Sequence, residues 1–378
     1  MGHFLEHRIR DARIMVVGCG ALGNEVLKNL ALAGAGHLVL VDFDQVEESN
    51  LTRSILFRRE DALAGCRKVD VAARRLREIN PAIQVTTIFG DVAYDVGLGY
   101  FADADVVIGC VDSRWGRYCI NRLCMRAGTP WVDGAIEGLQ GTARVFAPGK
   151  NCYACNLGPV GLEELRRRMP CSGVIRREER AGHVPTTAVA ASIIGAVQVQ
   201  EAMKIIDPDS VADASAVSLL GRMFHYDGAC TTARTADFAA FDDDCPVHEV
   251  WGPVSDSPLT AGSTVAQTLE FLRSQAASSR DGDVSFFLHD DCFVDFVEAA
   301  DGSLRVEAML PGRRVEAFAS EHELLRGYPL SELTQNEYRR IDASFPYAGL
   351  SLGSLGIPPF DILKARILND TFYYRMKG

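Results

Sequence analysis

One stretch of the chain has the residue types and spacing of a nucleotide site. It begins with an apolar run at 14–17 and continues through the turn GCGALG, which contains Gly18, Gly20 and Gly23, into a helical pattern. Such a turn exposes backbone N–H groups and a helix N-terminus to phosphate oxygens. A second apolar run ends at Asp42, nineteen residues after Gly23, close to the roughly 20-residue spacing at which an acid reaches ribose hydroxyls. Alone, this pattern also fits an NAD-dependent oxidoreductase.

The charged and polar residues that follow favour ATP chemistry over hydride transfer. Asp44 lies just after the second apolar run, Asn50 and Arg53 lie in SNLTRS, and Lys68 ends GCRK, fifteen residues after Arg53. A single arginine or lysine is usually a solvated surface group. A site that cleaves ATP, however, must neutralise charge that develops on the phosphates, and this pair would do so. The stretch therefore predicts an adenylation pocket.

Asp112 follows a third apolar run, at 105–110. Open α/β sheets bind ligands at the carboxyl edge of their strands, so Asp112 is expected near the glycine turn, where it would hold Mg²⁺. The alternative is that it caps the helix predicted over 114–127.

In these motifs the chain resembles the activating enzymes for ubiquitin-like proteins and the related adenylyltransferases of sulfur-carrier proteins in molybdopterin and thiamine biosynthesis. The resemblance covers about residues 14–248, and its motifs are GCGALG, VDFD, SNLTRS, GCRK and the run from Asp112 through Arg117 to Asn121. It implies that the C-terminal carboxylate of a partner protein attacks Mg-ATP, forming an acyl-adenylate. The implied nucleotide contacts are Gly18, Gly20, Gly23, Asp42, Asp44, Asn50, Arg53, Lys68 and Asp112. An idle scaffold subunit is disfavoured, because the two cations and Asp112 occur together.

Two separated pairs of residues form a candidate zinc site. Cys152 and Cys155 make a CxxC pair, which alone could be half a zinc site, a redox pair or neither. Cys245 and His248 have the same spacing, 89 intervening residues later. Together they form a Cys₃His set suited to a structural Zn²⁺. The relatives have cysteine where this chain has His248.

Cys171 is the candidate nucleophile. It lies among arginines at 166–168, 176, 177 and 180, and neighbouring guanidinium groups lower a thiol pKa and favour the reactive thiolate. The resemblance implies a thioester on this cysteine and transfer to a conjugating enzyme. Alternatively, Cys171 is an ordinary loop cysteine and the enzyme stops at the adenylate, as a sulfur-carrier adenylyltransferase does.

The first thirteen residues are basic. Many relatives have a longer N-terminal helix that lends an arginine to the neighbouring subunit's ATP. Arg8 or Arg10 could serve here, or could simply be solvated. The resemblance also implies a homodimeric or pseudo-symmetric arrangement of adenylation domains.

Composition limits the remaining possibilities. The chain has 378 residues and 47% apolar residues, enough for a sizeable core, and its net charge of −11 argues against nucleic acid as the principal partner. No uninterrupted apolar run is long enough to predict a membrane span. The eleven cysteines, without a secretion signal, are expected to be reduced thiols or metal ligands in the cytoplasm.

The hydrophobic pattern predicts an α/β fold, with a Rossmann-like adenylation domain and a mainly parallel sheet over 1–250. The predicted helices lie at 24–30, 69–79, 114–127 and 188–206, and the predicted strands at 14–17, 37–41, 83–89, 105–110, 131–134, 138–145 and 223–226. Glycine and proline clusters predict a linker over 251–264. Residues 265–378 should form a smaller α+β domain, with one of its short strands at 314–317. By position it resembles the ubiquitin-fold domain that recruits a conjugating enzyme, although a dimerisation or regulatory domain fits as well.

Overall fold

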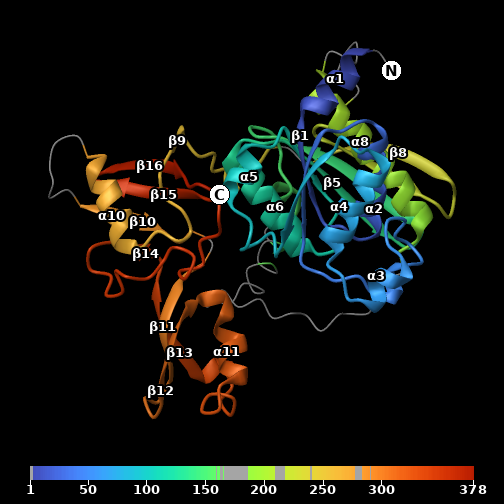
Figure 1. Cartoon of the computed structure of the whole chain (residues 1–378). Helices are drawn as coiled ribbons and strands as arrows, with labels where there is room; N and C mark the ends of the chain where they lie inside the picture. The colour runs from blue at the N-terminus through green and yellow to red at the C-terminus, as the bar shows by residue number, and fades with distance from the viewer. Residues whose placement is uncertain are drawn as a thin grey trace. The chain divides into compact units, whose positions relative to one another are not determined.

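The computed structural model describes residues 3–158, 160–161, 165, 186–208, 218–238, 241–276, 283–289 and 291–378 (Figure 1). These residues form two compact units. The first is built mainly from 3–93, 100–158 and 186–250, and the second mainly from 94–99 and 251–378.

The first unit is built around an eight-stranded sheet with the order β3-β2-β1-β4-β5-β6-β7-β8. The strands are β1 (Arg13–Val17), β2 (His37–Asp42), β3 (Gln84–Phe89), β4 (Val106–Gly109), β5 (Trp131–Glu137), β6 (Gln140–Phe146), β7 (Arg222–Asp227) and β8 (Thr232–Asp237). The first five are parallel and the last three antiparallel. The Rossmann-like prediction is therefore confirmed. Strand β8 was not predicted, because every residue of it is exposed and the sequence TARTAD has no apolar alternation.

The α-helices described up to residue 206 are α1 (His3–Asp11), α2 (Ala21–Leu32), α3 (Arg59–Leu63), α4 (Lys68–Ile79), α5 (Leu98–Ala102), α6 (Arg114–Ala127) and α8 (Ala188–Ile206). Buried side chains of α1, α2, α4 and α8 lie in one apolar cluster with side chains of β1 and β2. Among the described helices, α8 is long and apolar enough to cross a membrane by length and composition. Its Ile194 and Ala202 are nevertheless buried in the same core cluster as Val16 of β1, which is how the central helix of an α/β unit behaves.

The N-terminal residues form helix α1. Arg8, one of the two arginines considered for a neighbouring active site, pairs with Asp207 of its own chain at 3.0 Å. Arg10 contacts His7 at 2.7 Å and Asp11 at 3.5 Å. An arginine contributed between subunits stays a prediction.

The second unit has a five-stranded sheet and a three-stranded sheet, ordered β14-β10-β15-β16-β9 and β12-β11-β13. Their strands are β9 (Val254–Asp256), β10 (Val284–Phe287), β11 (Phe293–Ala299), β12 (Arg305–Pro311), β13 (Leu333–Tyr338), β14 (Arg340–Ile341), β15 (Ile362–Ile367) and β16 (Asp370–Arg375). The helices are α10 (Val265–Ser274) and α11 (Val315–Glu321). Each sheet has its own apolar cluster. The ubiquitin-like assignment of this unit stays a prediction.

Two predictions for this region need correction. The expected linker over 251–264 contains β9, which pairs in parallel with β16, and Trp251 stacks on Tyr373 at 4.8 Å between ring centroids. The segment is therefore part of the second unit. The expected strand over 314–317 is helical instead: Arg314 ends a 3-10 helix and Val315 begins α11. The buried residues of α11, Val315 and Ala319, lie one helical turn apart.

The glycine turn after β1 depends on close backbone approach. Gly18 has φ +97°, and a Cβ atom there would lie 2.6 Å from the carbonyl oxygen of Cys110. A Cβ atom at Gly23 would lie 2.0 Å from the carbonyl oxygen of Gly18. At Gly20 a Cβ atom would meet nothing within 4 Å. Backbone packing thus requires glycine at positions 18 and 23. At position 20 the protein itself leaves room for a side chain, so glycine there is explained by the approach of a ligand.

We therefore expect Gly23→Ala to destabilise the first unit by about 3 kcal/mol or more, because backbone must move to admit the methyl group. Gly20→Ala is the matched control and should unfold at the wild-type temperature. Thermal unfolding of the three proteins measures this difference. Equal unfolding temperatures for both variants would contradict the packing argument.

Candidate nucleotide site and metal centre

The N-terminus of α2 faces the glycine turn without a side-chain cap. Gly20 is the N-cap residue and provides no capping hydrogen bond. The first N–H groups of a helix lack intrahelical partners, and together with the helix dipole they favour an anion. This is the arrangement that a phosphate-binding turn requires.

Asp42 connects that turn to the end of β2. Its Oδ2 accepts the backbone N–H of Cys19 at 2.6 Å, and its Oδ1 accepts the N–H of Asp44 at 2.8 Å. Burial raises the pKa of the Asp42 carboxyl, and Lys68 opposes that rise. Asp42 therefore has a structural task that its predicted role did not include. Each carboxylate oxygen still has accepting capacity for a ribose hydroxyl.

Asp44 and Lys68 form an ion pair beside Asp42. The Lys68 Nζ lies 2.8 Å from Asp44 Oδ2, and the lysine side chain is 10% exposed whereas the Asp44 side chain is 44% exposed. The pair places one buried ammonium at the carboxyl edge of the sheet, next to the glycine turn. Both residues are recognisable separately in the sequence, and the folded chain brings them together.

Asn50 and Arg53 shape the loop after β2. Asn50 Oδ1 accepts the backbone N–H of Glu47 at 2.9 Å, and Arg53 donates to the carbonyl oxygen of Ser49 at 2.9 Å. The guanidinium has five N–H donors, so others remain for a phosphate. The described contacts do not join Arg53 to Lys68.

Asp112 is exposed and is not the N-cap of α6. That position belongs to Ser113, whose side chain accepts the N–H of Gly116 at 3.0 Å. The capping alternative for Asp112 was therefore wrong. Within the described part of the chain its carboxylate makes no hydrogen bond or ion pair. It follows Cys110, whose carbonyl oxygen approaches Gly18, so it lies at the edge where the glycine turn begins.

A buried charge network stands behind this edge. Asp133 has no exposed surface, and it accepts from Arg117 Nε at 3.1 Å and from Arg144 Nε at 3.0 Å. Arg117 also donates to the carbonyl oxygen of Val111 at 2.7 Å, immediately before Asp112. In the sequence, Arg117 is recognisable only as part of a motif. The partner Asp133 had no local signal, because it lies in an otherwise apolar strand.

The predicted nucleophile Cys171 lies outside the described residues. Its role stays a prediction.

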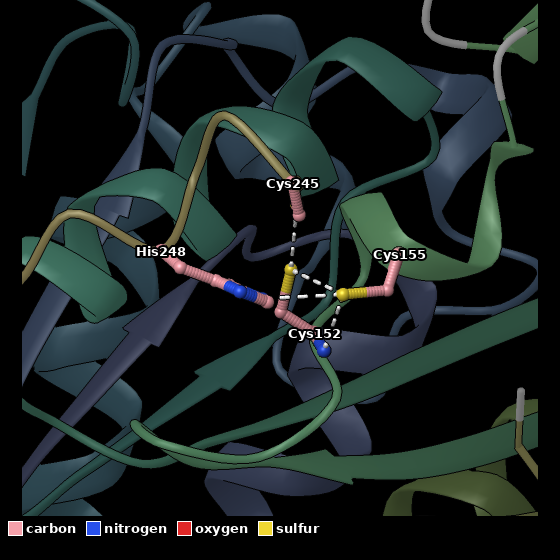
Figure 2. Close-up of side chains that lie close together, drawn as sticks. All are labelled: Cys152, Cys155, Cys245 and His248. Carbon is pink, nitrogen blue, oxygen red and sulfur yellow. Dashed lines mark hydrogen bonds between the residues drawn. The ribbon is translucent and has the colours of Figure 1, made fainter. Parts of the chain in front are cut away.

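The four predicted metal ligands converge on one point, as Figure 2 shows. The ligand atoms of Cys152, Cys155, Cys245 and His248 all lie within 4.8 Å of one another. Cys152 Sγ lies 3.8 Å from Cys245 Sγ and 3.6 Å from Cys155 Sγ, and Cys155 Sγ lies 3.2 Å from His248 Nε2. Tetrahedral Zn²⁺ with Zn–S bonds of about 2.3 Å would hold its sulfur atoms about 3.8 Å apart.

The chemistry of these side chains also fits a metal ion. Burial raises the pKa of the Cys152 and Cys245 thiols and lowers the pKa of His248. Neutral imidazole is the ligating form of histidine, and a bound cation stabilises thiolates that burial alone would keep protonated. The His248 ring stacks on Phe241 at 4.3 Å. With four protein ligands the centre is closed, which is typical of a structural site.

We expect the purified protein to contain about one metal ion per chain, with tetrahedral coordination as at other structural sites. Cys245→Ser should lose that ion and lower the unfolding temperature, since one thiolate is missing. Cys230→Ser, which changes an exposed cysteine in the first unit, should retain both. Elemental analysis and thermal unfolding check this, and full metal content in Cys245→Ser would contradict the assigned ligand set.

Comparisons with known proteins identify relatives of the first unit. The model of the ThiF family matches residues 2–247. The chain is 32% identical over 240 residues to the SAMP-activating enzyme E1 of Haloferax volcanii, covering 64% of this chain and 81% of that protein. It is 33% identical over 199 residues to the adenylyltransferase and sulfurtransferase MOCS3 of Sus scrofa, covering 52% of this chain but only 41% of that protein.

Among solved structures, Escherichia coli MccB has a similar fold, with a TM-score of 0.52 and 22% identity over 65% of this chain and 67% of that one. Residues 248–378 lie beyond the family match. Since that match covers well over half of the chain, this protein belongs to the ThiF family of E1-like adenylyltransferases.

Proposed function

We propose that this protein adenylates the C-terminal carboxylate of a ubiquitin-like protein and then carries the acyl group as a thioester. The observation that supports this best is the arrangement at the carboxyl edge of the sheet. There the uncapped α2 N-terminus, the buried Lys68 ammonium and the exposed carboxylate of Asp112 lie around one glycine turn. The name of the Haloferax volcanii relative, a SAMP-activating enzyme, is consistent with this reading.

In the proposed first step, a carboxylate oxygen of the partner attacks the α-phosphorus of ATP. The bond from that phosphorus to the bridging oxygen breaks, pyrophosphate leaves, and an acyl-adenylate remains. Lys68 and Arg53 would stabilise the charge that develops on the phosphates, and Asp42 and Asp44 would orient the ribose. Asp112 would hold Mg²⁺, which when bound neutralises charge on the departing pyrophosphate.

In the proposed second step, the Cys171 thiolate attacks the acyl carbonyl and AMP leaves, so that a thioester forms. A thiol of a conjugating enzyme would then take the acyl group by exchange. The second unit is a candidate surface for that enzyme. We also propose a homodimer, a cytoplasmic location and Zn²⁺ at the Cys₃His centre, where it would join the segment after β6 to the end of the unit.

A second candidate is a sulfur-carrier adenylyltransferase that stops at the acyl-adenylate. The similarity to MOCS3, named as both an adenylyltransferase and a sulfurtransferase, favours it. Both candidates share the first step and differ in the fate of the adenylate. An NAD-dependent oxidoreductase would need neither the lysine nor Asp112.

The first step is tested by ATP–pyrophosphate exchange with candidate ubiquitin-like and sulfur-carrier proteins. Lys68→Ala should lower exchange by about 100-fold or more, because a buried cation beside the developing charge is lost. Arg59→Ala is the control, since that side chain is 77% exposed and its nearest acid is Glu48 at 3.8 Å. Undiminished exchange in Lys68→Ala would refute the assigned role.

The second step is tested by non-reducing electrophoresis of the full chain with Mg-ATP and each candidate carrier. A thiol-sensitive adduct should form in the wild type and in Cys230→Ala, and should be absent in Cys171→Ala. Pyrophosphate exchange without any adduct would instead establish the sulfur-carrier type or another acceptor.

A further inference from the structure

Asn121 of α6 contacts the metal-binding loop, which is the segment that contains Cys152 and Cys155. Asn121 is fully buried. Its Oδ1 accepts the backbone N–H of Tyr153, between the ligands Cys152 and Cys155, at 3.0 Å, and it accepts the indole N–H of Trp131 at 3.3 Å. Both partners are donors only, so the amide oxygen must face them. The orientation of the Asn121 amide is therefore determined, and its Nδ2 points away from these two groups.

The Nδ2 atom of Asn121 is buried and has no hydrogen-bond partner among the described residues. A buried N–H donor without a partner costs free energy, so this atom calls for an acceptor. Cys152 is the candidate acceptor, because it immediately precedes Tyr153 in the chain, and the oxygen of the same buried amide lies 3.0 Å from the Tyr153 backbone nitrogen.

A neutral thiol is a weak acceptor, whereas a metal-bound thiolate carries negative charge and accepts strongly. We propose that Asn121 is a positioning residue of the metal centre, with Nδ2 donating to Cys152 Sγ and Oδ1 holding the loop at Tyr153. Side chains that donate to metal ligands commonly orient them and tune the metal. This inference depends on the metal centre and not on the proposed adenylation.

The position of Asn121 also links two parts of the first unit. It lies one helical turn after Arg117, whose side chain donates to the carbonyl oxygen of Val111 beside Asp112. Residues four apart lie on the same face of a helix. One face of helix α6 therefore contacts two places. Arg117 contacts the carboxyl edge of the sheet beside the glycine turn, here called the nucleotide edge, and Asn121 contacts the metal-binding loop.

The test compares variants of the full chain loaded with Zn²⁺ or Co²⁺. Asn121→Ala should lower metal affinity by about 10–100-fold, measured by transfer to a chromogenic chelator. It should also shift the cysteine-to-Co²⁺ charge-transfer absorption, because the thiolate loses a hydrogen bond. Ser113→Ala, which removes only the α6 cap, should change neither value.

Trp131→Phe tests whether Asn121 acts through its Nδ2 hydrogen bond or only through its packing in the core. It removes one donor to Asn121 Oδ1 and leaves Nδ2 in place, so it should retain the wild-type Co²⁺ spectrum. A wild-type spectrum and affinity in Asn121→Ala would overturn the proposal. If Asn121→Ala does not fold, a crystal structure of the metal-loaded wild type decides: Nδ2 within hydrogen-bonding distance of Cys152 Sγ supports the proposal, and a longer separation refutes it.

Discussion

The carboxylate of Asp42 is the interaction on which the nucleotide edge depends. One oxygen holds the N–H of Cys19 inside the glycine turn, and the other holds the N–H of Asp44 after β2. The second bond sets the direction in which Asp44 leaves the strand, and Asp44 in turn holds Lys68. A single acid therefore connects the phosphate turn, the end of β2 and the first residue of α4. Asp42 is also close enough to Lys68 for that cation to oppose the rise in the Asp42 pKa that burial causes.

Helix α6 has a comparable role behind that edge. Ser113, and not Asp112, caps it, and Arg117 and Asn121 contact the sheet and the loop that contains Cys152 and Cys155. Asp133 pairs with both Arg117 and Arg144, so its buried charge is compensated from two sides. Removal of one partner from such a network would leave a buried charge uncompensated. The desolvation of the charged groups offsets much of their attraction, so the network fixes the positions of these side chains more than it adds to the free energy of unfolding.

The candidate metal centre lies next to this helix, because the loop of its first two ligands is bonded to Asn121. Its first two ligands follow β6, and the other two follow β8 near the end of the unit. A tetrahedrally coordinated ion would join these two segments, which also meet where Phe146 stacks on Phe238 at 5.2 Å between ring centroids. Tyr153, between the first two ligands, packs against Trp131 and Phe146. A bound ion would add a connection between the segments that follow β6 and β8, beyond the strand pairing within the sheet.

The sequence by itself determined the order and type of the main elements of the first unit and the identity of the candidate ligands. Strand and helix periodicity is local, and glycine, cysteine and histidine spacings reflect chemistry that does not depend on distant residues. Tertiary structure decided which of these residues meet. The pairing of Lys68 with Asp44, the capping of α6 by Ser113 rather than Asp112, and the inclusion of β9 in a sheet with β16 all depend on positions set by packing to within an ångström. Local patterns carry no such information, because a hydrogen bond or ion pair forms or fails over a distance smaller than one side chain.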